Sequence, residues 1–198
     1  MDNAFRIVNF LGKNIGESST MHEVSIKTEI PYATFHRTIQ DMSKFHMIKE
    51  KEVGHSKAIT LNLENPSIKA YLTIGSIIDA EDFLKGRPLF KKIVSELPDD
   101  KGVYRESVLL FGSYAKGEYT DKSDIDILVL NRKGAKSLSF SKYELLFKKK
   151  INPIFFTEQE FKQMLKEKEE NVGKQVLKNH IVLKNPSYFW DMVLNAIR

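Results

Sequence analysis

The sequence predicts an α/β protein, in the α+β sense, with helices packed around small sheets. Two apolar runs, 108–111 and 125–130, are long enough for buried strands and flank a turn rich in polar residues. Earlier in the chain, three helical patterns precede two short strand patterns. We therefore expect an N-terminal domain at residues 1–64, a connecting helix at 65–87, and a C-terminal domain at 88–198. The C-terminal domain should contain a small mixed sheet flanked by helices.

The first 64 residues have the pattern of three helices and a hairpin. Thr20 and Glu23 have the spacing of a capping box, in which each side chain binds a free backbone N–H of the other. Pro31 suits the first turn of a helix, because its missing N–H is not needed there. The expected elements are helices at 3–12, 20–29 and 31–44 and strands at 47–53 and 58–63, and the third helix should bury Phe35, Ile39 and Met42.

This order of elements resembles a winged helix-turn-helix domain. The resemblance implies that helix 31–44 is the recognition helix and that the turn 54–57 is the tip of the wing. Arg37, Gln40 and Lys57 are then the candidates for contacts with double-stranded DNA. Alternatively, the same surface docks a partner protein.

The second part of the chain alternates helices and strands. Its first helix, about 67–85, is apolar on several sides, which predicts packing between two domains or against another copy in a homodimer. The further elements expected are a helix at 89–97, a loop at 98–102, a third strand at 151–156, helices at about 158–170 and 173–179, and a final helix at 186–198. Thr157 should cap the helix that begins at Glu158.

The polar residues around the two central strands form the candidate site. Asp124 and Asp126 are two positions apart on a strand, so their side chains should lie on one side, with Cα atoms roughly 6–7 Å apart. Two carboxylates that close favour a bound cation, and Mg²⁺ is commonly held by one or two carboxylates plus substrate phosphates. Gly112 and Ser113 begin a turn that offers backbone N–H groups to a phosphate. The alternative is a loop with two solvated aspartates.

Gly112-Ser113, a spacer and Asp124-Ile125-Asp126 resemble the signature of the minimal members of the DNA polymerase β-type nucleotidyltransferase superfamily. The resemblance covers roughly residues 88–198. It implies that Gly112 and Ser113 hold the triphosphate of an NTP, and that Asp124 and Asp126 are catalytic and bind Mg²⁺ in a one- or two-metal site. Lys116, one turn further on, could reach a phosphate or remain solvated.

The resemblance also identifies one departure. Active members of the family usually have a third acid, a general base and metal ligand, on the strand that corresponds to 151–156. Asn152 stands there, and its amide cannot take a proton. Pro153 removes a backbone N–H, which predicts a strand at the edge of the sheet with an open position for an aspartate at 152.

The amino-acid composition and the charge distribution exclude some classes of protein. Cysteine is absent, which excludes disulfides and thiolate zinc sites. No apolar run could span a membrane and the start lacks a secretory pattern, so we expect a cytoplasmic protein. The formal charge of +5 lies entirely in residues 65–198, which hold 23 basic and 18 acidic residues. A basic excess favours nucleotides or nucleic acid as partners.

Two functions of different classes remain from the sequence. The first is Mg²⁺-dependent transfer of a nucleotidyl group from an NTP to an unknown acceptor, a protein or an RNA. The second is a DNA-binding regulator or antitoxin-like protein whose C-terminal domain only binds nucleotide.

Overall fold

The chain is described by a computed structural model for residues 3–54, 56–98, 106–134 and 136–197. It divides into two compact units, Met1–Gly75 and Ser76–Arg198, and both mix helices with small sheets, so the predicted α/β class is confirmed. The boundary falls inside α4 (Ile68–Leu84). His55 of the predicted turn 54–57 and residues 99–102 of the predicted loop lie outside the described residues.

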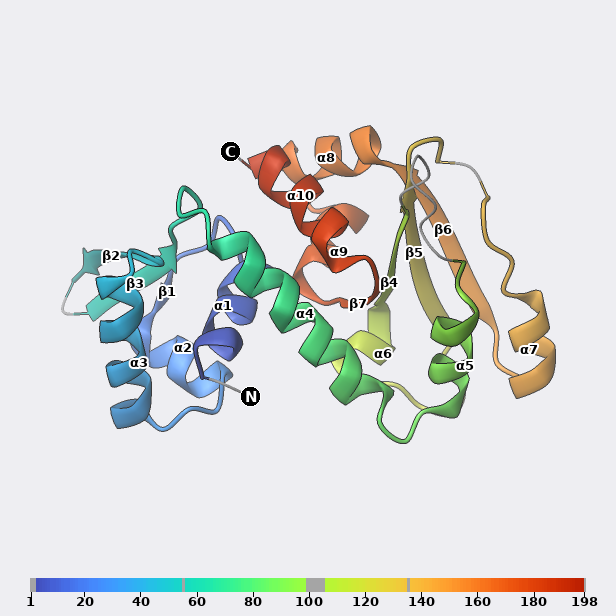
Figure 1. Cartoon of the computed structure of the whole chain (residues 1–198), viewed down its shortest axis with the longest axis horizontal. Helices are drawn as coiled ribbons and strands as arrows, with labels where there is room; N and C mark the ends of the chain where they lie inside the picture. Colours follow the sequence, from blue (N-terminus) through green and yellow to red (C-terminus); the bar gives the residue numbers. More distant parts are fainter. Residues whose placement is uncertain (1–2, 55, 99–105, 135, 198) are drawn as a thin grey trace. The chain divides into compact units, whose positions relative to one another are not determined.

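The first unit places three helices beside a three-stranded antiparallel sheet (Figure 1). Its sheet has the order β1-β3-β2. The predicted elements are confirmed, and a two-residue strand that pairs with β3 is added before the second helix. The bounds are α1 Asn3–Lys13, β1 Ser19–Thr20, α2 Met21–Lys27, α3 Tyr32–Lys44, β2 Ile48–Val53 and β3 Ser56–Leu61.

Local signals in the sequence explain these helices. The capping box is present, since the Thr20 hydroxyl accepts the Glu23 N–H at 3.2 Å and the Glu23 carboxylate accepts the Thr20 N–H at 2.7 Å. The stripe predicted for α3, Phe35, Ile39 and Met42, is buried. Pro31 is the N-cap residue of α3, one position before the first helical residue.

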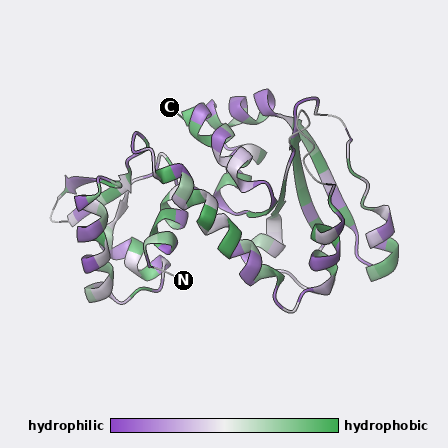
Figure 2. Cartoon of the chain, viewed as in Figure 1, coloured by the Kyte–Doolittle hydropathy of each residue, from purple (hydrophilic) through white to green (hydrophobic). Residues whose placement is uncertain are grey.

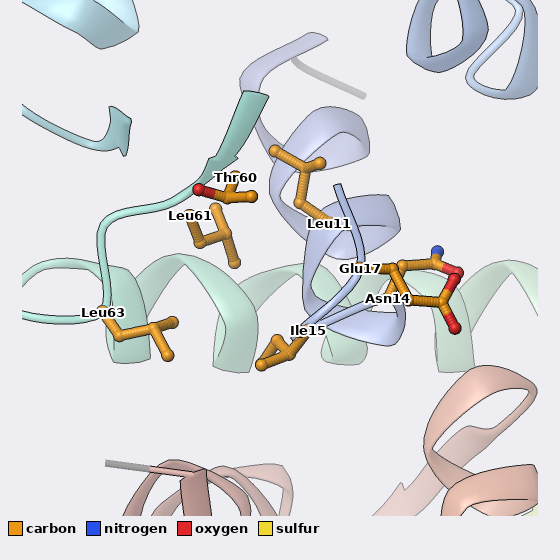
Figure 3. Close-up of a pocket in the computed structure, with 8 residues that line it drawn as sticks. Leu11, Asn14, Ile15, Glu17, Thr60, Leu61 and Leu63 are labelled. Atoms are coloured by element: carbon orange, nitrogen blue, oxygen red, sulfur yellow. The ribbon is translucent and has the colours of Figure 1, made fainter. Parts of the chain in front are cut away.

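A small cavity of about 40 Å³ lies between the end of α1 and β3 (Figure 3). Leu11, Ile15, Leu61 and Leu63 supply its apolar part. Space of this size holds one or two water molecules. It is far too small for a nucleotide, and it is not a candidate for the nucleotide site.

The second unit is built on a four-stranded mixed sheet with the order β6-β5-β4-β7. β4 is antiparallel to both β5 and β7, whereas β5 and β6 are parallel. β6, which contains Pro153, is therefore an edge strand, as predicted. The bounds are α5 Pro88–Glu96, β4 Glu106–Phe111, α6 Gly112–Lys116, β5 Ile125–Asn131, α7 Ser141–Phe147, β6 Ile151–Thr157, α8 Glu158–Lys166, α9 Val172–Lys178, β7 Ile181–Lys184 and α10 Pro186–Ile197.

Both faces of this sheet are covered by helices. Alternate residues of β4 and β5, such as Val108 and Ile127, join Phe90 of α5 and Tyr143 of α7 in one hydrophobic cluster. The apolar residues between them, including Leu128, are fully buried outside that cluster. Figure 2 shows the central strands as largely hydrophobic, which is the pattern of strands buried on both faces. This burial fixes the positions of β4 and β5, and with them the polar residues at the strand ends.

Three features of this unit differ from the sequence prediction. α7 and β7 were not expected, and α8 ends at Lys166 instead of near residue 170. β7 is only four residues long. It is a strand because it pairs with β4, and this long-range pairing leaves no pattern in the local sequence. The predicted N-cap of α8 is confirmed, because the Thr157 hydroxyl accepts the Glu160 N–H at 3.0 Å.

Glu96 joins α5 to α7, the helix that precedes β6. Its carboxylate contacts Lys92 and Lys142, both at 2.5 Å, and accepts the Tyr143 hydroxyl at 2.9 Å. The Lys142 ammonium, the Lys92 ammonium and this hydroxyl lower the pKa of Glu96 to about 2. Glu144 of α7 then accepts the Ile151 N–H at 2.8 Å, so α7 helps to hold the start of β6.

None of the helices in the described part of the chain combines the length and apolar composition that crossing a lipid bilayer requires.

Candidate active site

The site is built where β4 ends and β5 begins. Phe111, the last residue of β4, pairs with Asp126 of β5. Gly112 then turns the chain into α6 with a φ of +68°, a value that L residues rarely adopt. A Cβ atom at this position would lie 2.3 Å from Oδ2 of Asp126. Glycine is thus required at 112 both by its backbone conformation and by the closeness of the Asp126 carboxylate.

Asn152 of β6 brings the two aspartates together. It is the register partner of Asp126 in the parallel β5–β6 pair. Its side-chain NH₂ donates to Oδ2 of Asp124 at 3.2 Å and to Oδ1 of Asp126 at 3.3 Å. An amide NH₂ has two N–H bonds, and one can point to each carboxylate. The expectation of an open position at 152 is wrong, because this side chain is half-buried and bridges both acids.

Lys150 adds a positive charge to the same carboxylate. Its Nζ lies 3.0 Å from Oδ2 of Asp124, the oxygen that Asn152 also contacts. Lys150 first, and Asn152 second, lower the pKa of Asp124. The main chain at Lys150 is fixed, since its carbonyl accepts the Ile125 N–H at 2.9 Å.

A tight turn leads into Asp124. The Ser123 hydroxyl accepts the Thr120 N–H at 2.9 Å, and the Ser123 N–H donates to the Thr120 carbonyl at 3.1 Å. The Lys149 ammonium donates to the Asp121 carbonyl. Ser123 therefore closes the turn that sets the position of Asp124.

The other predicted nucleotide-binding residues lie on α6. Ser113 is the second residue of this helix, whose N-cap is Phe111. Lys116 is the exposed last residue of α6, and within the described ranges it forms no ion pair with either aspartate. Gly117 follows in the left-handed conformation and ends the helix. The structure thus brings Gly112, Asp124 and Asp126 together, while Lys116 is exposed at the end of α6.

The predicted DNA-contacting residues are in the first unit. Arg37 and Gln40 are exposed on α3 and Lys57 is exposed on β3. Lys57 lies 3.1 Å from Glu50, whose pKa is lowered by the Ser43 hydroxyl and then by Lys57. The charge of Lys57 is therefore partly compensated within the protein.

The two carboxylates at Asn152 are the candidate ligands for a divalent metal. The described residues contain no group of three or more His, Cys, Asp and Glu side chains arranged to hold a metal ion. They do place two carboxylates around one amide. Mg²⁺ is commonly bound by one or two carboxylates when phosphates and water supply the remaining ligands. Asp124 and Asp126 fit this ion on the condition that a nucleotide completes its coordination.

The sequence model of the family described as "Nucleotidyltransferase domain" matches residues 89–193, which include Gly112, both aspartates and Asn152. This chain belongs to the nucleotidyltransferase domain family. Such proteins generally use a nucleoside triphosphate and a divalent metal, and the match supports an enzyme of the transferase class.

Two proteins of Methanocaldococcus jannaschii are similar to this nucleotidyltransferase-family chain, and both carry the name "Putative protein adenylyltransferase". One is 34% identical over 94 residues, which cover 44% of this chain and 91% of that protein. The other is 54% identical over 33 residues, which cover 15% of this chain and 33% of that protein. No solved structure matches the chain.

Sequence reasoning missed Lys150 in this nucleotidyltransferase-family site. Lys150 is one of seven chemically similar basic residues between positions 132 and 150. Only the parallel pairing of β5 with β6 places it against Asp124, 26 positions away in the chain. Its position directly before the predicted third strand was the one available signal.

We predict different effects of alanine at two glycines that share a left-handed conformation. Gly117→Ala meets no atom within 4 Å and should lower the free energy of unfolding by about 1–2 kcal/mol from backbone strain alone. Gly112→Ala adds a clash with Asp126 and should lower it by a further ~1–3 kcal/mol. Urea unfolding at neutral pH measures both values, and equal losses would show that the Gly112–Asp126 approach carries no constraint.

Proposed function

We propose that the protein is a metal-dependent adenylyltransferase that moves AMP from ATP to a hydroxyl group of a protein. The observation that carries this is the placement of Gly112 against the carboxylate of Asp126, beside Asp124. It would join two carboxylates that can ligate a metal to a turn whose backbone N–H groups favour a phosphate. The names of the similar M. jannaschii proteins favour adenylyl transfer to protein over transfer to RNA.

Each residue has a role in this proposal. Asp124 and Asp126 would hold Mg²⁺, which stabilises negative charge on the transferring phosphoryl group when bound. Gly112 and Ser113 would orient the triphosphate through backbone N–H groups, with the Ser113 hydroxyl as an additional donor. Lys116 would contact the outer phosphates from the end of α6. We assign this chemistry to residues 88–198, with 65–87 as the connecting helix and 1–64 as the binding domain.

The proposed reaction is a substitution at the α-phosphorus of ATP, and it needs no oxidant or reductant. The acceptor oxygen bonds to the α-phosphorus, the bond from that phosphorus to the oxygen bridging to the β-phosphorus breaks, and pyrophosphate leaves. Asn152 has no basic atom to take the proton of the acceptor hydroxyl, so this proton would pass to water or to a phosphate oxygen of the nucleotide. General-base help is typically worth about 10²–10⁴-fold, so we expect a slow enzyme.

The experiment that tests the function uses ATP labelled on its α-phosphate. The full chain is incubated with Mg²⁺, labelled ATP and a cell extract, and labelled macromolecules are separated and treated with protease or ribonuclease. Label that protease removes supports a protein acceptor, whereas label that ribonuclease removes points to RNA. No label in either fraction, with nucleotide binding intact, would favour a domain that only binds nucleotide.

We predict that Asp124→Asn combined with Asp126→Asn removes the Mg²⁺-dependent part of ATP binding. Loss of a charge that stabilises the transition state commonly costs about 10²–10³-fold in rate, so transfer should fall at least 100-fold. The fold should survive, because the change relieves carboxylate repulsion. Isothermal titration with ATP, with and without Mg²⁺, measures the effect, and Asp121→Asn serves as the matched control. Unchanged Mg²⁺-dependent affinity would exclude this metal site.

A second function, as a DNA-binding regulator whose nucleotidyltransferase domain is degenerate, is favoured by one observation. Arg37 and Gln40 are exposed on α3, and the order of helices and antiparallel strands in the first unit fits a winged helix-turn-helix. The equal numbers of basic and acidic residues in 1–64, eight each, argue against strong binding to DNA phosphates. We propose weak DNA binding as the alternative to docking of a protein.

For this alternative we predict that Lys57→Ala reduces the salt dependence of duplex binding by about one in slope, through loss of one phosphate contact. Arg37→Ala should do the same. Lys85→Ala is the control, since Lys85 is an exposed lysine paired with Asp82 in the second unit. Binding of the full chain to a labelled duplex is measured from 50 to roughly 200 mM salt. Failure to bind any duplex at the lowest salt would mean that the partner is not DNA.

A further inference from the structure

Lys150 is a charged residue at the site that the proposed chemistry does not use. Its ammonium lies 3.0 Å from Oδ2 of Asp124, and that oxygen also accepts from Asn152 at 3.2 Å. A metal ion ligated through this oxygen has to displace one of the two donors. Asn152 is held in register with Asp126, whereas among the described residues the end of the Lys150 side chain is tied through this contact alone. Lys150 is therefore the donor that moves.

Displacement of Lys150 is energetically cheap because the contact is exposed. The Lys150 side chain is 67% exposed and that of Asp124 is 40% exposed. Exposed ion pairs of this kind contribute little to stability. The backbone at Lys150, in contrast, is fixed by the hydrogen bond from Ile125, so the ammonium can swing only within the reach of one side chain.

The charges of the two aspartates and of a bound triphosphate determine where the displaced Lys150 ammonium goes. Asp124 and Asp126 carry two negative charges, and Lys150 reduces the net charge of this group to −1. A divalent ion is attracted weakly by a net charge of −1 and is repelled by the ammonium. A triphosphate brings its own negative charges, which attract both the ion and the displaced ammonium.

We propose that Lys150 couples the two ligands: it weakens binding of a divalent metal alone, and it contacts the phosphates when metal and nucleotide bind together. The inference rests on the proposed metal and nucleotide site. It assigns Lys150 as a specificity-determining residue that makes the site select the metal–nucleotide complex over the free metal ion. By thermodynamic linkage, each ligand then raises the affinity for the other by the same factor.

The test compares Lys150→Met with Lys149→Met in the full chain. Both variants lose one adjacent positive charge, but the Lys149 ammonium donates to the Asp121 carbonyl and not to Asp124. Mn²⁺ binding is measured by electron paramagnetic resonance, alone and with an ATP analogue whose α–β bridging oxygen is replaced by methylene. Unfolding temperatures of both variants confirm that they are folded.

Lys150→Met should bind Mn²⁺ alone about tenfold more tightly than the wild type, from the loss of a unit charge a few ångströms from the ion. It should bind the nucleotide with Mn²⁺ more weakly, so the coupling factor falls. Lys149→Met should match the wild type in both measurements. Equal Mn²⁺ affinities of the two variants, or an unchanged coupling factor, would overturn the role of Lys150.

The same assay separates this inference from the proposed function. If the Asp124→Asn, Asp126→Asn protein binds Mn²⁺ as the wild type does, the metal site itself is wrong. If that protein loses Mn²⁺ binding while Lys150→Met behaves like Lys149→Met, the metal site stands and only the role of Lys150 fails.

Discussion

The repulsion between two carboxylates, one just before β5 and one inside it, is the constraint on which the candidate site depends. Asp126 is the second residue of β5, whereas Asp124 lies one residue before this strand and not on it as predicted; both carboxylates still meet at Asn152, and their charges have to be compensated. Asn152 donates to both, and Lys150 contacts Asp124. Compensation by one amide and one exposed ammonium keeps the carboxylates close without neutralising them, which suits the proposed binding of a metal together with a nucleotide.

The sheet supplies the positions that this compensation needs. β5 lies between antiparallel β4 and parallel β6, so the turn after β4 and the start of β6 reach the same end of β5. Gly112 then approaches Asp126 more closely than any other residue type could. Glu144 holds the start of β6 through the Ile151 N–H. The apolar strands beneath are buried on both faces, and they make this end of the sheet a rigid support.

Many of the helices, the central strands and the aspartate pair could be predicted from the sequence, because they depend on residues close together in the chain. The two-residue spacing of Asp124 and Asp126 predicts side chains on the same side of an extended chain. The capping residues Thr20 and Thr157 predict where their helices begin. β1 and β7 could not be predicted, because strands of two and four residues exist only through pairing with distant partners. Lys150 was missed for the same reason, since its contact with Asp124 depends on the register of two parallel strands.

In the proposed function, the neutral amide of Asn152 stands where the polymerase β-type proteins that the chain resembles usually have a third acid, and the proposed metal site is left without a general base. The most direct measurement compares adenylyl transfer by the wild type and by Asn152→Asp at saturating Mg²⁺ and ATP, with the same acceptor. We expect slow transfer by the wild type and a rate about 10²–10⁴-fold higher in the variant, from restored general-base help. Rapid transfer by the wild type with no gain in the variant would contradict the claim and mean that another group takes the proton.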